Sequence, residues 1–209
     1  MRHALVQSGP NLSERLTDAQ NAALARALAP LGAPPAAFER FKPWFVSMTL
    51  ATVAAQQLGI NAEQGAEKLL TAAARERGMP IDALETIEFQ LGVFDSLSEE
   101  QQLAQLQQAL DNLERLPEMM APMLAAWSAG DVERLVEMID QVSVDDPELH
   151  RALFTERNAN WTNWIEERMR RPGTVFLAVG AGHLAGSDSV QTMLGQRGIA
   201  SERMARAGE

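Results

Sequence analysis

The sequence predicts a mostly helical α/β fold, with a small parallel or mixed sheet covered by a large helical portion. Three observations support this prediction. Apolar residues recur at helical spacing through most of residues 10–170. Two runs of β-forming residues follow within the C-terminal part, 171–209, at Thr174–Val179 and Gly198–Met204. A helix between two such runs implies a parallel pair of strands.

The composition indicates one folded domain over 1–209. Apolar residues make up 46% of the chain and charged residues 22%, which is ordinary for a chain with a real core. The net charge of −10 argues against a nucleic-acid partner, because an acidic chain repels phosphate. The absence of cysteine excludes disulfides, thiolate metal ligands and a cysteine nucleophile.

Turn and cap signals divide the first half of the chain. Met1–Gly9 reads as the end of a strand, and its short apolar run Ala4–Val6 stops at the Gly9-Pro10 turn. Pro43 is tolerated in the first turn of a helix, and Gly59 closes that helix. The expected helices are Glu14–Ala29, Phe38–Phe41, 43–59, Ala62–Arg77 and Thr86–Leu97, with a short strand at Met79–Leu84.

The second half begins with a capping box formed by Ser98 and Gln101, which opens a helix to Leu113. One apolar stripe of that helix contains Leu103, Leu106, Leu110 and Leu113. The helices expected after it are Met119–Ser128, Val132–Ile139, one opened by Asp146-Pro147, Asn158–Arg170 after a break or kink, and Ser187–Gly195.

The strongest local feature is the segment Val179–Leu184, in which a predicted buried strand runs into a glycine-rich turn that ends at His183. Gly180 and Gly182 let the backbone bend and approach a ligand closely. Ligands of α/β sheets bind beyond the carboxyl ends of strands. His183 can therefore be a metal ligand or a general base. The alternative is a histidine that only caps the next helix.

A second feature is the triplet Glu156-Arg157-Asn158, which can supply a carboxylate ligand and a cation for an oxyanion. The alternative is an ordinary helix start with a solvated salt bridge. Trp161 and Trp164 lie on one helical face and are expected in the core.

Glu85 is a third candidate, because it follows the predicted strand at Met79–Leu84. It can equally belong to the N-cap region of the next helix. His150 lies in a charged helical stretch and is not expected to act in a site.

Taken together, these residues resemble the TraB/GumN family, the bacterial relatives of the Tiki metalloproteases. The resemblance covers nearly the whole chain. It rests on Lys42-Pro43-Trp44, Leu84-Glu85-Thr86, Gln90, Phe94-Asp95, Glu156-Arg157-Asn158, Trp161, Phe176–Leu184, Gly186 and Arg197-Gly198.

The family pattern implies two Gly-x-x-His motifs, a glutamate after the first motif and an arginine. Gly180–His183 matches the second motif, and Arg157 matches the arginine, with Glu156 beside it. The first motif is absent, since His3 has no glycine three residues before it. The chain is therefore expected to be an N-terminally truncated form of this domain.

The resemblance implies a metal-dependent, peptidase-like hydrolase that acts on a peptide or protein. A divalent ion (manganese, cobalt or zinc) would be held by His183, Glu156 and Glu85 and would activate water. Glu156 could be ligand or base, and Arg157 would stabilise negative charge. With only part of the site, the chain is expected to be weakly active or inactive.

The competing hypothesis is a non-catalytic, helix-rich binding or assembly module of the cell envelope. The family implies the periplasm or cell envelope. No signal peptide is evident and no apolar run reaches the roughly 18 residues of a membrane span. If Met1 is the genuine start, the cytoplasm is expected instead.

Overall fold

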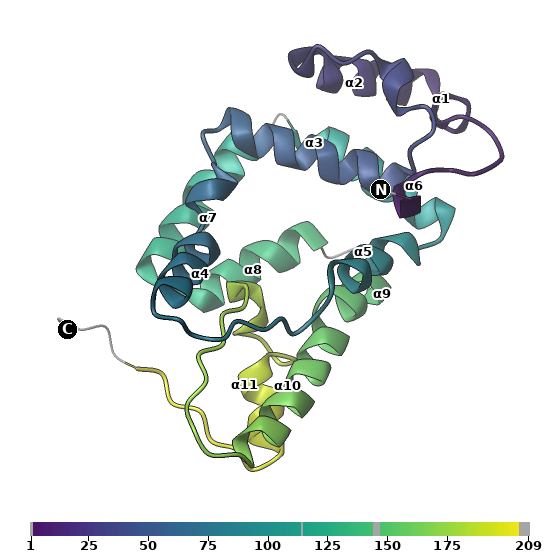
Figure 1. Cartoon of the computed structure of the whole chain (residues 1–209). Helices are drawn as coiled ribbons and strands as arrows, with labels where there is room; N and C mark the ends of the chain where they lie inside the picture. The colour runs from purple at the N-terminus through teal and green to yellow at the C-terminus, as the bar shows by residue number, and fades with distance from the viewer. Residues whose placement is uncertain (1, 114, 144–146, 205–209) are drawn as a thin grey trace. The chain divides into compact units, whose positions relative to one another are not determined.

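The computed structural model describes residues 2–113, 115–143 and 147–204. Two compact units are present, Met1–Met120 and Ala121–Glu209, and each is described by itself. The ribbon in Figure 1 consists of helices joined by turns and extended segments. The expectation of a single domain over 1–209 stays a prediction.

The helices of the first unit follow the predicted order along the chain. They are α1 (Leu12–Arg15), α2 (Asp18–Leu28), α3 (Pro43–Gln57), α4 (Ala66–Glu76), α5 (Ile87–Asp95) and α6 (Glu99–Asn112). The predicted helix Glu14–Ala29 is interrupted, because Thr17 leaves helical geometry and caps α2 by accepting a hydrogen bond from the backbone N–H of Gln20. The short helix expected at Phe38–Phe41 is a 3₁₀ turn at Pro35–Phe38.

The core of the first unit is formed by buried residues of α1, α2, α3 and α6. Of these helices, α3 and α6 run side by side in Figure 1. The predicted stripe on α6 faces this core, with Leu106 and Leu110 buried and Leu103 and Leu113 packed at its margin. The capping box is also confirmed: Ser98 Oγ accepts from the Gln101 N–H at 3.2 Å, and Gln101 Oε1 accepts from the Ser98 N–H at 2.9 Å.

Two motifs that are far apart in the sequence meet beside this core. Lys42 forms an ion pair with Asp95, and the indole N–H of Trp44 donates to the same carboxylate at 3.2 Å. The Trp44 ring also stacks on Phe94 at a centroid distance of 6.1 Å. The Lys-Pro-Trp and Phe-Asp segments therefore join the start of α3 to the end of α5.

The second unit is built on α10 (Glu156–Met169), which lies beside α11 (Val190–Gln196) in Figure 1. The remaining helices are α7 (Leu116–Ala129), which begins in the first unit, α8 (Val132–Ser143) and α9 (Pro147–His150). A π-helical turn at Arg151–Thr155 joins α9 to α10 and accounts for the predicted break before Asn158. Asp146, expected to open α9, lies outside the described residues.

The predicted sheet is wrong: the described residues contain no strand, and their single β-bridge joins Leu5 to Phe41. Thr174–Val179 runs without regular structure and has no backbone hydrogen-bond partner among the described residues. Its apolar side chains are not buried on two faces, since Phe176 is 70% exposed. A β-forming run becomes a strand only where another segment completes its hydrogen bonds, and no described segment does so.

The strand end predicted within Met1–Gly9 is reduced to the bridge at Leu5. Two further predicted strands are wrong for the same reason as Thr174–Val179. Met79–Leu84 and Gly198–Met204 are irregular, and the side chains of Ile81 and Met204 are largely exposed. Gly198 instead ends α11 in the left-handed region at φ +76°. The Ile199 N–H then donates to the Leu194 carbonyl at 3.0 Å, as in a helix C-cap. The C-terminal part therefore contains the predicted helix but not its flanking strands.

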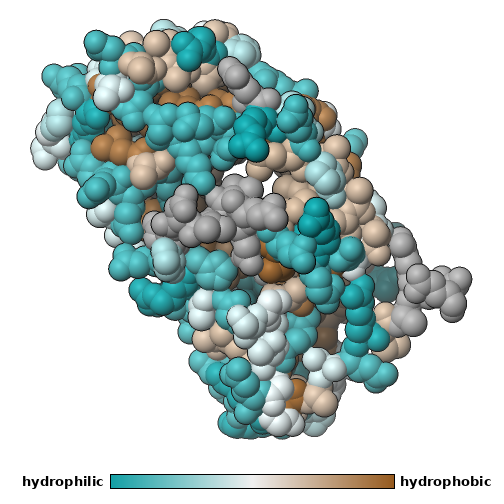
Figure 2. Space-filling view, turned by 180° about the vertical axis from the view of Figure 1, so that it is seen from behind, coloured by the Kyte–Doolittle hydropathy of each residue, from teal (hydrophilic) through white to brown (hydrophobic). Residues whose placement is uncertain are grey.

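The described surface is mixed in polarity. Figure 2 shows apolar residues reaching the surface between hydrophilic ones on the face drawn. The largest exposures of apolar side chains besides Phe176 and Met204 are at Leu69, Ile87, Leu124 and Met169. None of the described helices combines the length and apolar content that a bilayer crossing requires.

Removing a core leucine from α6 should destabilise the first unit. Leu106 is 0% exposed, so Leu106→Ala should lower the free energy of unfolding by about 2–5 kcal/mol through lost burial and a cavity. Leu69→Ala is the matched control, since Leu69 is 66% exposed and should cost less than about 1 kcal/mol. Urea unfolding followed by circular dichroism measures both, and equal costs would contradict this core assignment.

Candidate functional site

His183 lies inside the second unit, at the end of the 3₁₀ turn Ala181–His183. Its side chain is 6% exposed. The imidazole ring packs between Trp161, at a centroid distance of 4.5 Å, and Phe154, at 5.1 Å. His183 is therefore an interior side chain rather than one at an open strand end.

A buried asparagine sets the orientation of this ring. The Nδ1 atom of His183 lies 2.7 Å from Oδ1 of Asn158, whose side chain is 1% exposed. Because the amide oxygen is an acceptor, the hydrogen bond requires the proton on Nδ1. In the neutral ring, Nε2 then has the lone pair, the nitrogen that binds a metal ion or a proton.

The same asparagine holds the next turn of the chain. Its Nδ2 atom donates to the carbonyl oxygen of Asp188 at 2.9 Å. Asn158, Trp161 and Thr162 form the buried face of α10 at the i, i+3, i+4 spacing. Their spacing marks Asn158 as an inward-facing polar residue, a signal in the sequence that identifies it as part of the site.

The two glycines of the turn have different roles. Gly182 packs closely, since an added Cβ would lie 3.1 Å from Ile139 Cδ1 and 3.2 Å from Phe154 Cε1. At Gly180 an added Cβ would meet only an ordinary contact, 3.6 Å from the His183 ring. Close side-chain packing therefore explains the glycine at 182. Binding of a cofactor by either glycine stays a prediction.

Two other predicted site residues, Glu156 and Arg157, lie in the first turn of α10 and make different contacts. Glu156 pairs with Arg151 and is 52% exposed, the solvated salt bridge considered as its alternative. The Arg157 guanidinium lies 5.0 Å from the centroid of the Trp161 ring and donates to the Leu153 carbonyl at 3.0 Å. Trp161 thus contacts both Arg157 and His183. It is buried as expected, whereas Trp164 is 40% exposed.

Glu85 belongs to the first unit, where it accepts a hydrogen bond from Gln90 at 3.1 Å. The residue after it, Thr86, is the N-cap of α5. Within the described ranges, no three histidine, aspartate or glutamate side chains are grouped so that they could hold a metal ion. The described residues therefore do not form a complete metal centre.

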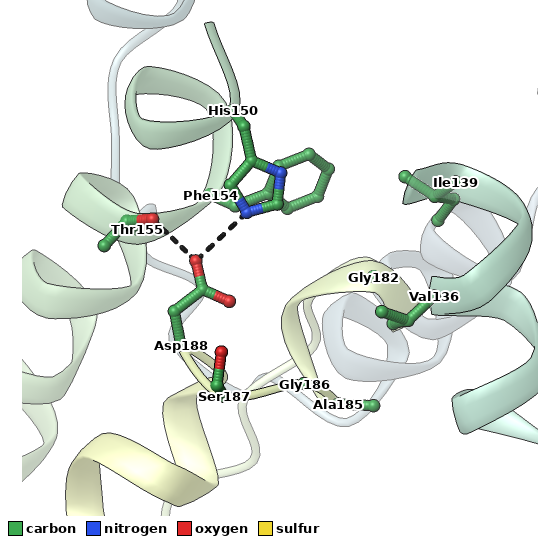
Figure 3. Close-up of a pocket in the computed structure, with 10 residues that line it drawn as sticks. All are labelled: Val136, Ile139, His150, Phe154, Thr155, Gly182, Ala185, Gly186, Ser187 and Asp188. Atoms are coloured by element: carbon green, nitrogen blue, oxygen red, sulfur yellow. Dashed lines mark hydrogen bonds and ion pairs between the residues drawn. The ribbon is translucent and has the colours of Figure 1, made fainter. Parts of the chain in front are cut away.

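A cavity of about 340 Å³ lies next to this turn, in the second unit. Figure 3 shows His150 and Thr155 pointing at Asp188, with Val136 and Ile139 of α8 across the opening. Oδ2 of Asp188 accepts from Thr155 Oγ1 at 2.6 Å and lies 3.2 Å from His150 Nε2. Thr155 and Asp188 were not predicted as site residues from the sequence, and His150 was not expected to act in a site, because nothing in the spacing of these three residues links them.

The fold and site define a helical protein whose second unit encloses a Gly-x-x-His turn, with the histidine bonded to a buried asparagine. The model of the TraB/PrgY/gumN family matches residues 1–203, so the chain belongs to this family. The uncharacterized protein YbaP of Escherichia coli K12 is 28% identical over 183 residues, covering 88% of this chain and 67% of YbaP. YbaP of Shigella flexneri matches equally. No solved structure matches the chain.

Removing the asparagine should destabilise the second unit. Asn158→Ala removes the acceptor for His183 and the donor for the Asp188 carbonyl, so two buried polar groups lose partners. We expect a loss of about 2–4 kcal/mol in the free energy of unfolding. Asn163→Ala, on the exposed face of the same helix, should cost less than about 0.5 kcal/mol.

Nitrogen NMR of the histidine rings provides a second readout of the same contact. His183 of the wild-type protein should show the tautomer protonated on Nδ1, and Asn158→Ala should lose that preference. An unchanged tautomer in the variant would show that Asn158 does not orient the ring.

Proposed function

We propose that this chain contributes His183 to the metal centre of a metal-dependent, peptidase-like hydrolase, and that its own residues bind the metal only weakly. Support comes from the orientation of the ring by Asn158. Metal-binding histidines usually have their second nitrogen held by such a hydrogen bond, which sets the tautomer and the ring direction.

The described residues by themselves fit only part of such a centre. Catalytic metal sites usually hold the ion with three protein ligands and one open position. His183 is a single ligand, and the described part of the chain contains no group of three. The remaining ligands would have to come from outside the described residues, so no catalytic step through a metal is derived from this chain.

Arg157 is the positively charged residue proposed for this site, because both its guanidinium and the His183 ring contact the Trp161 ring. A guanidinium in that position could stabilise an oxyanion of a peptide substrate.

Glu156 is a weaker candidate as ligand or base, since its carboxylate forms an ion pair with Arg151 at the surface. Glu85 stays a prediction. A location in the periplasm or cell envelope is part of the same proposal.

The second candidate is a non-catalytic binding or assembly module of the cell envelope. It is favoured by the burial of His183, whose ring is in contact with Phe154 and Trp161. A buried imidazole that only fills the core and satisfies Asn158 would bind no metal. The two candidates therefore differ in one measurable property, which is metal binding at His183.

Metal binding can be tested by equilibrium dialysis of the full chain against Mn²⁺, Co²⁺ or Zn²⁺, followed by elemental analysis. His183→Gln should weaken binding on the order of tenfold or more. His3→Gln, which removes an exposed histidine of the first unit, is the control and should bind as the wild type does. Peptidase activity of all three proteins should stay near background. Equal metal content in the wild type and His183→Gln would exclude His183 as a ligand.

The wild-type protein provides a test that does not depend on the folding of a variant. Paramagnetic Mn²⁺ should broaden the NMR signals of the His183 ring before those of His150. Absence of bound metal, with sharp signals from both rings, would favour the non-catalytic module.

A further inference from the structure

The cavity beside Asp188 is a second place in this unit where a ligand can bind, and His183 is not among its lining residues. Its volume of about 340 Å³ is at the lower end of the range for small-molecule sites. α8 supplies one wall, the π-helical turn supplies the ring of Phe154, and the Gly186–Asp188 turn supplies the third side (Figure 3).

The polar side chains among the described lining residues are those of His150, Thr155, Ser187 and Asp188. Asp188 is 27% exposed and has no arginine or lysine partner among the described residues. Thr155 and His150 both bind its Oδ2 atom. Its Oδ1 atom accepts no hydrogen bond from any described residue and faces Gly186, where an added Cβ would lie 3.8 Å away. One carboxylate oxygen is thus left for a ligand.

His150 complements this carboxylate. Its Nε2 atom lies 3.2 Å from Oδ2 of Asp188, so the ring donates to this oxygen through Nε2. The cavity therefore presents the second oxygen of a carboxylate, which suits a ligand with N–H donors and a positive charge.

The side chains that line the cavity determine which chemical groups the rest of the ligand can have. Val136, Ile139 and Phe154 are apolar and contact the hydrocarbon part of a ligand. A carboxylate disfavours anionic ligands. Among the described lining residues, a metal ion would find two strong ligands, His150 and Asp188. An alkyl or aryl ammonium ion satisfies both the charged end and the apolar wall.

We propose that this cavity binds a small primary amine, with its ammonium group on Asp188 and its hydrocarbon part against Ile139, Val136 and Phe154. The ammonium donates to Oδ1 of Asp188, while Thr155 and His150 hold the other carboxylate oxygen in place. This site does not use His183, so its test is independent of the metal-binding test.

The experiment measures binding of n-butylamine and benzylamine to the full chain at neutral pH by ligand-observed NMR. Asp188→Asn should weaken both on the order of tenfold or more, because it removes the charge-assisted hydrogen bond. Glu137→Gln is the matched control: it removes one negative charge from the exposed face of α8 and should leave the affinity unchanged. n-Butanol, which lacks the charge, should bind on the order of tenfold more weakly than n-butylamine.

A second variant keeps the carboxylate and fills the space. Val136→Phe should abolish amine binding while Asp188 stays charged, which guards against misfolding of Asp188→Asn. Thermal unfolding checks that both variants fold. Equal affinity of the wild type and both variants would overturn the site. Butanol binding as tightly as butylamine would overturn the ammonium assignment, and so would displacement of the amine by Zn²⁺ that His150→Gln prevents.

Discussion

The second unit depends on the two hydrogen bonds of the Asn158 side chain. The amide oxygen accepts from His183 and the amide nitrogen donates to the Asp188 carbonyl, so one buried side chain holds both ends of the turn that follows the Gly-x-x-His motif. A buried amide left without these partners would be costly. This requirement orients the imidazole against Trp161 and sets the position of Asp188 beside the cavity.

A series of side chains therefore connects the two candidate sites. His183 is bonded to Asn158, Asn158 to the backbone of Asp188, and the carboxylate of Asp188 to His150 and Thr155. Phe154 contacts both histidine rings at centroid distances of 5.1 Å. The histidine that the family resemblance singles out and the histidine that the sequence analysis set aside thus share the same supporting residues.

The most informative disagreement concerns Thr174–Val179. Its residues are strong β-formers, and the prediction of a strand buried on both faces followed from them. The segment is instead irregular and exposed, and no described residue pairs with its backbone. The turn after it still forms, because the 3₁₀ bond from the His183 N–H to the Gly180 carbonyl is local.

The sequence by itself determined the order of most helices, several of their caps and the family. Helical hydrogen bonds join residues three or four apart, so signals such as Ser98 with Gln101 or the leucine stripe of α6 contain their own partners. Only the tertiary structure decided the fate of the β-forming runs, the burial of His183 and the meeting of His150 with Asp188, 38 residues apart. Each of these needs a partner distant in the chain, and local spacing does not specify which residue that is.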